Sequence, residues 1–192
     1  MRYYADLILT LTQKEIKVKY KNSVLGYFWS VLNPLSMALV FYFAFKAVLK
    51  IPIENFTLYL ITGLFPWQWF CNSVASSSVS LLANSSLIKK VNFPRYFIPL
   101  SNVLNDAVHF FLSLPVIFGF AVLYKVYPTL SWLFGIPLIM LAQFLITYGF
   151  SLFVSSINLF FRDLERLVNI FLNILFYATP IIYTSNLIPE HI

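Results

Sequence analysis

The sequence has 192 residues, of which 60% are hydrophobic and only 10% are charged. Soluble domains contain about 25% charged residues, so this composition excludes an ordinary soluble domain. The net charge of +6 is also found in nucleic-acid-binding proteins, but here the basic residues form short clusters between long apolar runs. That distribution is typical of the cytoplasmic loops of membrane proteins. We therefore expect an all-α integral membrane protein that binds no nucleic acid.

The N-terminal segment, residues 1–23, is expected to form an amphipathic helix that lies on the membrane surface. Its apolar side chains, among them Leu11, share one helical face, whereas Lys14, Lys17 and Lys21 recur at helical spacing on another. The same charges occupy the place where a cleavable signal peptide needs an apolar core. We therefore expect the first apolar run after this helix to target the protein to the membrane.

Five apolar runs follow, and each is long enough to cross about 30 Å of hydrocarbon as a helix. They cover residues 27–49, 56–82, 100–123, 130–154 and 167–183. Pro34 is expected to kink the first of them. The second contains Gly63 and Pro66, followed by a cluster of serines. This pattern has two interpretations, a helix break at an interfacial aromatic belt or small residues that let helices pack closely.

The distribution of Lys and Arg predicts the orientation. If every run crosses the membrane, the N-terminal segment and the loops around Lys89 and Arg162 fall on one side and collect ten of these residues, against three, Lys46, Lys50 and Lys125, on the other. Because positive loops remain in the cytoplasm, we expect a cytoplasmic N-terminus.

Sequence motifs for the common enzyme mechanisms are missing. There is no GxxxxGK[ST], HExxH or GxSxG pattern, and the only cysteine is Cys71, inside an apolar run. P-loop ATP hydrolysis, zinc-protease chemistry and serine-hydrolase chemistry therefore lack their required residues. We expect a chain that is not an enzyme and that binds no metal or cofactor.

Asp106 and His109 lie about one helical turn apart inside the third apolar run. Ionisable residues in the membrane are costly and are by default functional candidates. A local pair that fixes helix packing is the favoured interpretation, and a proton relay is the alternative.

The basic loop SLIKKVNFPRYFIPLS carries an aromatic segment between two prolines. The prolines stiffen a short piece that a partner protein could bind. Equally, Lys89, Lys90 and Arg95 could serve only to set the topology and to contact anionic lipid.

Three segments together resemble the ABC-2 type permeases that export polysaccharides, with the O-antigen type closest. They are KVKYKNSVLGYFWSVLNPL, LIKKVNFPRYFIPLS and NLFFRDLERLVNIFLNILFYATPIIY. The residues that match the family pattern in the first segment are Lys19, Tyr20, Ser23, Leu25, Gly26, Trp29 and Pro34. The family usually has six spans, so a sixth span is expected that this chain, with five, does not include.

The resemblance implies a single ABC-2 type transmembrane domain over residues 1–192, with its bundle over residues 27–183 and a coupling loop over residues 84–99. It implies a homodimer in the bacterial inner membrane, surrounded by lipid and docked on two copies of a cytoplasmic ATPase subunit, which would bind the ATP and Mg²⁺. The exported substrate would be an undecaprenyl-diphosphate-linked glycan such as O-antigen. A capsule or teichoic acid exporter, or a permease for a drug or small lipid, is the alternative within the family.

The resemblance also implies three groups of functional residues. The contact with the ATPase would be made by Lys89, Lys90, Phe93, Pro94, Arg95 and Tyr96. The lipid pyrophosphate at the membrane surface would be met by Lys17, Lys19 and Lys21. The glycan path would be lined by the aromatic rings of Trp29, Tyr42, Phe45 and Tyr177.

Two hypotheses from other functional classes, an enzyme and a structural protein, are alternatives to an exporter. A membrane-embedded transferase that acts on a lipid carrier would need clustered carboxylates or histidines, but the seven acidic residues are scattered. A purely structural membrane subunit predicts that replacing the loop cations leaves transport unchanged.

Overall fold

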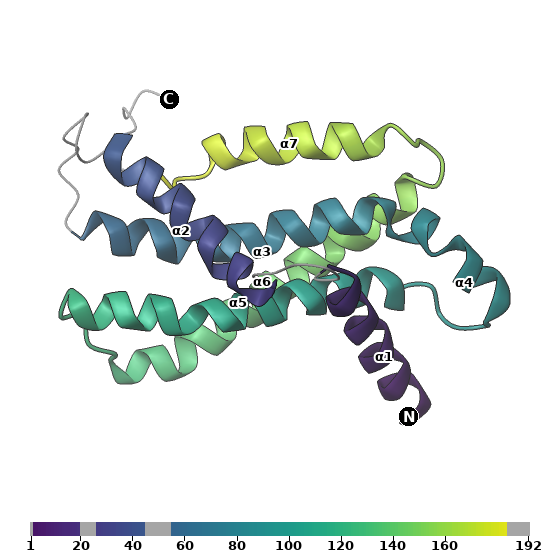
Figure 1. Ribbon diagram of the computed structural model, residues 1–192, viewed down its shortest axis with the longest axis horizontal. Helices are drawn as coiled ribbons and strands as arrows, with labels where there is room; N and C mark the ends of the chain where they lie inside the picture. The colour runs from purple at the N-terminus through teal and green to yellow at the C-terminus, as the bar shows by residue number, and fades with distance from the viewer. Residues whose placement is uncertain (1, 20–25, 45–54, 184–192) are drawn as a thin grey trace.

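A computed structural model describes residues 2–19, 26–44 and 55–183, and within these ranges the chain is all-helical (Figure 1). The elements are α1 (Arg2–Lys19), the 3-10 helix η1 (Gly26–Phe28), α2 (Trp29–Phe41), α3 (Phe56–Ala83), α4 (Ser85–Lys90), α5 (Phe97–Leu123), α6 (Leu130–Ile157) and α7 (Leu164–Ala178). The described part contains no β-strand. The prediction of an all-α fold is confirmed.

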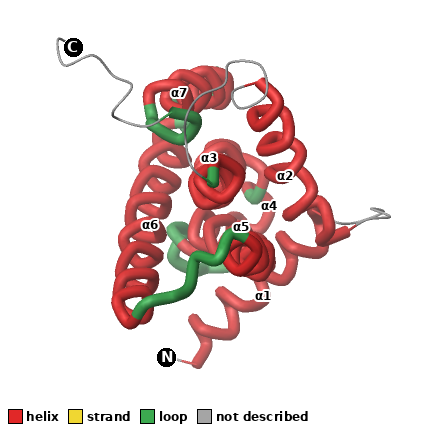
Figure 2. The backbone as a smooth tube through the Cα atoms, turned by 90° about the vertical axis from the view of Figure 1, so that its left-hand side faces the viewer, coloured by secondary structure: helices red, strands yellow, loops and turns green. Residues whose placement is uncertain are grey.

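Helix α3 lies at the centre of the bundle. It packs against α2, α5, α6 and α7, and Figure 2 shows these helices arranged around it. Toward the first residues of α3, one apolar core joins Ala38 of α2, Leu60 and Ile61 of α3, and Phe176 of α7. The central position explains why α3 has buried residues along its whole length.

The serine cluster serves close packing. Helix α3 continues without interruption through Gly63 and Pro66, so the predicted alternative of a helix break is wrong. Ser73, Ser77 and Ser78 are almost completely buried, at 0–1% exposure. Small side chains allow neighbouring helices to approach closely, and α3 is the helix that contacts α5 and α6 most extensively.

Two of the described helices, α5 and α6, are long and apolar enough to cross a membrane. Helix α3 is equally long but carries many serines and amides, and α7 has only 15 residues. Part of the first predicted span, residues 45–49, lies outside the described residues. Five spans therefore remain a prediction. The outward surface of α6 is apolar, with large exposed side chains such as Phe134 and Leu138, which suits contact with lipid.

The bundle gathers the basic loops at one end. Helices α3 and α6 end there and α5 and α7 begin there, with α4 between α3 and α5 (Figure 1). Helix α1 lies beside this end and packs against the first part of α5. The loop with Lys89 and Arg95 and the loop with Arg162 therefore share one end of the molecule.

Candidate functional site

The candidate site begins where α1 docks on the bundle. Leu11 of α1 is buried in an apolar cluster with Leu81 of α3 and with Phe93, Phe97 and Ile98. Because burial of each such side chain contributes about 1.5–3 kcal/mol, this cluster holds α1 against the loop and the start of α5.

Two lysines add polar links between α1 and the bundle. Lys14 Nζ donates to Asn84 Oδ1, which lies 2.5 Å away at the end of α3. Lys19 Nζ lies 2.7 Å from Asp106 Oδ1 on α5, although the two residues are 87 positions apart in the sequence. The last turn of α1 is thereby joined to the interior of the bundle.

The Asp106 carboxylate is almost fully enclosed. Its side chain is 3% exposed, against 39% for Lys19. Ser73 Oγ donates to Asp106 Oδ2 and the Asn105 amide donates to Oδ1, each at 3.2 Å. A buried carboxylate is tolerated when it is both paired and hydrogen-bonded, and these three donors meet that requirement. His109 lies in the same region and is 7% exposed.

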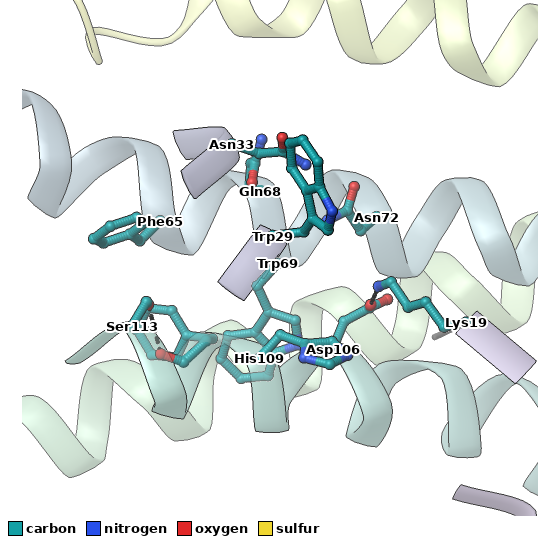
Figure 3. A pocket seen from close by; sticks show the side chains of 11 residues that line it. Lys19, Trp29, Asn33, Phe65, Gln68, Trp69, Asn72, Asp106, His109 and Ser113 are labelled. Carbon is teal, nitrogen blue, oxygen red and sulfur yellow. Dashed lines mark hydrogen bonds and ion pairs between the residues drawn. The ribbon is translucent and has the colours of Figure 1, made fainter. Parts of the chain in front are cut away.

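A cavity of about 250 Å³ opens beside this ion pair, between the end of α1, the start of α2, and helices α3 and α5 (Figure 3). Its polar lining comes from Lys19, Asn33, Gln68, Asn72, Asp106, His109 and Ser113. Its aromatic lining comes from Trp29, Phe65, Trp69 and Phe110. The Trp69 ring stacks on Phe110 with centroids 5.2 Å apart, and its Nε1 donates to Val103 O at 3.1 Å.

The predicted coupling residues lie in α4 and in the loop that follows it. Phe93 is 9% exposed and belongs to the cluster that holds α1. Lys89, Lys90, Arg95 and Tyr96 are exposed, and Pro94 is half-buried between them. The loop therefore has one buried anchor and a basic outer surface.

The three lysines predicted to meet a pyrophosphate differ in their surroundings. Lys17 is exposed on α1, Lys19 is paired with Asp106, and Lys21 lies outside the described residues. Of the two described lysines of this group, Lys17 is therefore the one without an ion pair.

Three of the four predicted aromatic residues lie in the described part of the chain, and all three are exposed. Trp29 at the start of α2 is 42% exposed, Tyr42 directly after α2 is 39% exposed, and Tyr177 on α7 is 65% exposed. Phe45 lies outside the described residues. Of these rings, Trp29 lines the polar cavity.

Sequence reasoning missed the amides Asn33, Gln68 and Asn72. Like Asp106, each is a polar side chain within an otherwise apolar run, and that feature could have marked them as candidates. Their spacing in the sequence, however, does not show that α2 and α3 bring them together. Within the described ranges, no group of three His, Cys, Asp or Glu residues is placed to hold a metal ion.

Comparison with known sequences identifies the family. The profile described as ABC-2 type transporter matches residues 6–192. The chain belongs to the ABC-2 type transporter family. Two Klebsiella pneumoniae proteins named O-antigen export system permease protein RfbA are each 52% identical to it over 188 residues, which cover 98% of this chain and 73% of the relative. A Myxococcus xanthus protein of the same name is 34% identical over 187 residues, or 97% of this chain and 72% of the relative.

Members of the ABC-2 type transporter family are transmembrane permease subunits that work with an ABC ATPase subunit and are not themselves the ATPase. The chain is accordingly a membrane protein, as its apolar helices also indicate. The absence of a P-loop from the sequence agrees with this division of labour.

Proposed function

We propose that this chain is the permease subunit of an O-antigen exporter, which moves a lipid-linked polysaccharide out of the cytoplasm across the bacterial inner membrane. The observation that carries the proposal is the 52% identity, over 98% of the chain, to proteins named O-antigen export system permease. Those names favour a polysaccharide over the alternative of a drug or a small lipid.

The coupling surface of the proposed exporter comprises the exposed basic residues of the segment 84–99. Lys89 and Lys90 end α4, and Arg95 lies just before α5, all at the end of the bundle that the charge distribution assigns to the cytoplasm. Phe93 connects this surface to α1 and α5 through one apolar cluster. Movement imposed on the loop by an ATPase would therefore pass to α1, α3 and α5 together.

Helix α1 is proposed to lie at the cytoplasmic membrane surface. Its described lysines include exposed Lys14 and Lys17, and its apolar residues Leu11 and Leu7 face the bundle. Lys17 is free to approach the pyrophosphate of a lipid-linked substrate, whereas Lys19 would first have to leave Asp106. Lys21 remains part of the proposal on the strength of the sequence alone.

The glycan path is proposed to lie between two copies of the chain, along α2 and α7. Both helices pack against α3 (Figure 2). Trp29, Tyr42 and Tyr177 are exposed there, and exposed amides such as Asn169 and Asn173 interrupt the apolar surface of α7. Polar groups at membrane depth favour a water-filled path over lipid. The five spans and the single domain over residues 1–192 belong to the same proposal.

Deletion of the gene tests this function. We expect O-antigen to disappear from the cell surface while lipid-linked O-antigen accumulates inside the cell, and both effects to be reversed by the wild-type chain. Normal surface O-antigen in the deletion strain would contradict the proposal. Loss of a drug-efflux phenotype instead would support the alternative substrate.

A further inference from the structure

The cavity beside the Lys19–Asp106 ion pair contains polar groups that lack partners. Asn33 and Asn72 are exposed and Gln68 is half-buried, and all three line the cavity. In the described part of the chain, none of these three amide side chains makes a hydrogen bond. Amides that line a cavity between apolar helices hydrogen-bond to whatever occupies it, water or a ligand. The cavity therefore offers several free donors and acceptors to a polar ligand.

The other walls define which ligand chemistry fits. The Lys19 ammonium donates one of its three hydrogens to Asp106. A hydrogen-bond donor and a carboxylate acceptor therefore lie side by side in the wall of the cavity. The Trp29 ring is 42% exposed and lies with the amides around the same space (Figure 3). One aromatic face, several amides and a carboxylate therefore surround one cavity.

Charge argues against an anionic ligand in this cavity. Lys19 is already neutralised by Asp106, and a phosphate placed here would approach the buried carboxylate. A neutral ligand with many hydroxyl groups avoids that repulsion and satisfies the amides. Sugars provide such hydroxyls, and their C–H faces pack on aromatic rings.

The size of the cavity limits the ligand to a small group. A volume of about 250 Å³ corresponds to about eight water molecules at roughly 30 Å³ each. One sugar ring fits this space, whereas an oligosaccharide does not. The neighbouring sugars of the glycan would lie outside the cavity.

We propose that this cavity is a saccharide subsite within each protomer, which holds one neutral sugar ring of the exported glycan. Asn33, Gln68 and Asn72 bind its hydroxyls, and Trp29 packs against its C–H face. The inference rests on the proposed function for the choice of glycan; the site shares Trp29 with the surface proposed to lie between two copies, but its amides lie within one protomer.

Binding of a labelled oligosaccharide tests the proposal. The full chain and its ATPase partner are placed in lipid nanodiscs, and the probe is a single oligosaccharide repeat unit of the O-antigen, with a fluorophore at its reducing end. Fluorescence anisotropy should show saturable binding. Gln68→Leu and Asn72→Leu should each weaken the affinity about fivefold, the effect of one neutral hydrogen bond of about 1 kcal/mol, and Trp29→Leu should weaken it as well.

Two further variants control for folding and location. Thr62→Val removes a polar group from the same helix, but the Thr62 hydroxyl donates to Leu58 O and Tyr59 O, so binding should be unchanged. Asn33→Leu replaces an exposed side chain on α2 and should weaken binding like Gln68→Leu, even if the α3 variants fold poorly.

Two results would overturn the subsite. The first is wild-type affinity in folded Asn33→Leu, Gln68→Leu and Asn72→Leu, which would locate the sugar elsewhere. The second is no binding to wild-type nanodiscs whose complex exports glycan in vesicles, which would leave the exporter intact and remove the subsite. Failure of both binding and export would reject the proposed function as well.

Discussion

Replacing Lys19 by methionine should destabilise the protein far more than replacing its ion-pair partner Asp106 by asparagine. In Lys19→Met the Asp106 carboxylate stays in a site that is 3% exposed and loses the cation 2.7 Å away. Breaking a buried pair in this way costs about 3–5 kcal/mol. For a chain of this size each kcal/mol lowers the Tm by about 2–4 °C, so a loss of roughly 10 °C is expected.

Asp106→Asn should have a much smaller effect. It leaves a carbonyl oxygen to accept from Ser73 or Asn105, and Lys19, whose side chain is 39% exposed, can reach water. No buried charge is left without a partner, so the cost is that of one net hydrogen bond, about 0.5–1.5 kcal/mol, and the Tm should fall by no more than about 6 °C.

The double variant separates the buried-charge penalty from general damage to the packing of α1. Lys19→Met/Asp106→Asn should recover most of the stability that Lys19→Met loses, because no buried charge remains without a partner. The assay is thermal unfolding of the purified protein in detergent, followed by intrinsic fluorescence. A double variant no more stable than Lys19→Met, or a Lys19→Met variant within about 2 °C of wild type, would refute the reasoning.

Three other predictions concern the loop and the first turns of α3. Phe93→Ala should lower stability by about 3–5 kcal/mol, because it removes a buried ring from the cluster shared with α1, and limited proteolysis should then release α1. The triple alanine variant of the three exposed loop cations should insert and purify normally but lose copurification with the ATPase; unchanged copurification would mean that these charges only set topology. Gly63→Val should lower stability by about 1–3 kcal/mol, because a Cβ added at this position lies 3.1 Å from Ile181 Cγ2. Amide hydrogen exchange should then rise around residues 180–183, where the Tyr59 hydroxyl donates to Pro180 O and Tyr183 O, each at 2.7 Å.

The helical bundle and its basic end could be predicted from the sequence because both depend on local composition. Apolar runs of membrane length predicted the ranges 100–123 and 130–154, and the structure has α5 over Phe97–Leu123 and α6 over Leu130–Ile157. Helix ends depend on turn geometry and are less certain: the run predicted over 167–183 corresponds to α7 over Leu164–Ala178.

The candidate site could not be predicted because it depends on contacts between distant segments. The local periodicity of α5 suggested a partner for Asp106 one turn away, at His109, but the carboxylate accepts from Lys19, Ser73 and Asn105. The pairing with Lys19 follows from how α1 docks through Leu11, which no residue spacing encodes. The cavity likewise exists only because α2 and α3 bring their amides together.

ATP-driven movement of lipid-linked O-antigen into inverted inner-membrane vesicles tests the central claim most directly. In these vesicles the cytoplasmic face is outside, so exported glycan becomes protected from an added O-antigen-binding antibody. We expect protection that requires ATP, the ATPase partner and this chain, and that is lost in the triple alanine variant of the loop. Protection that is equal with and without this chain would contradict its role as the permease.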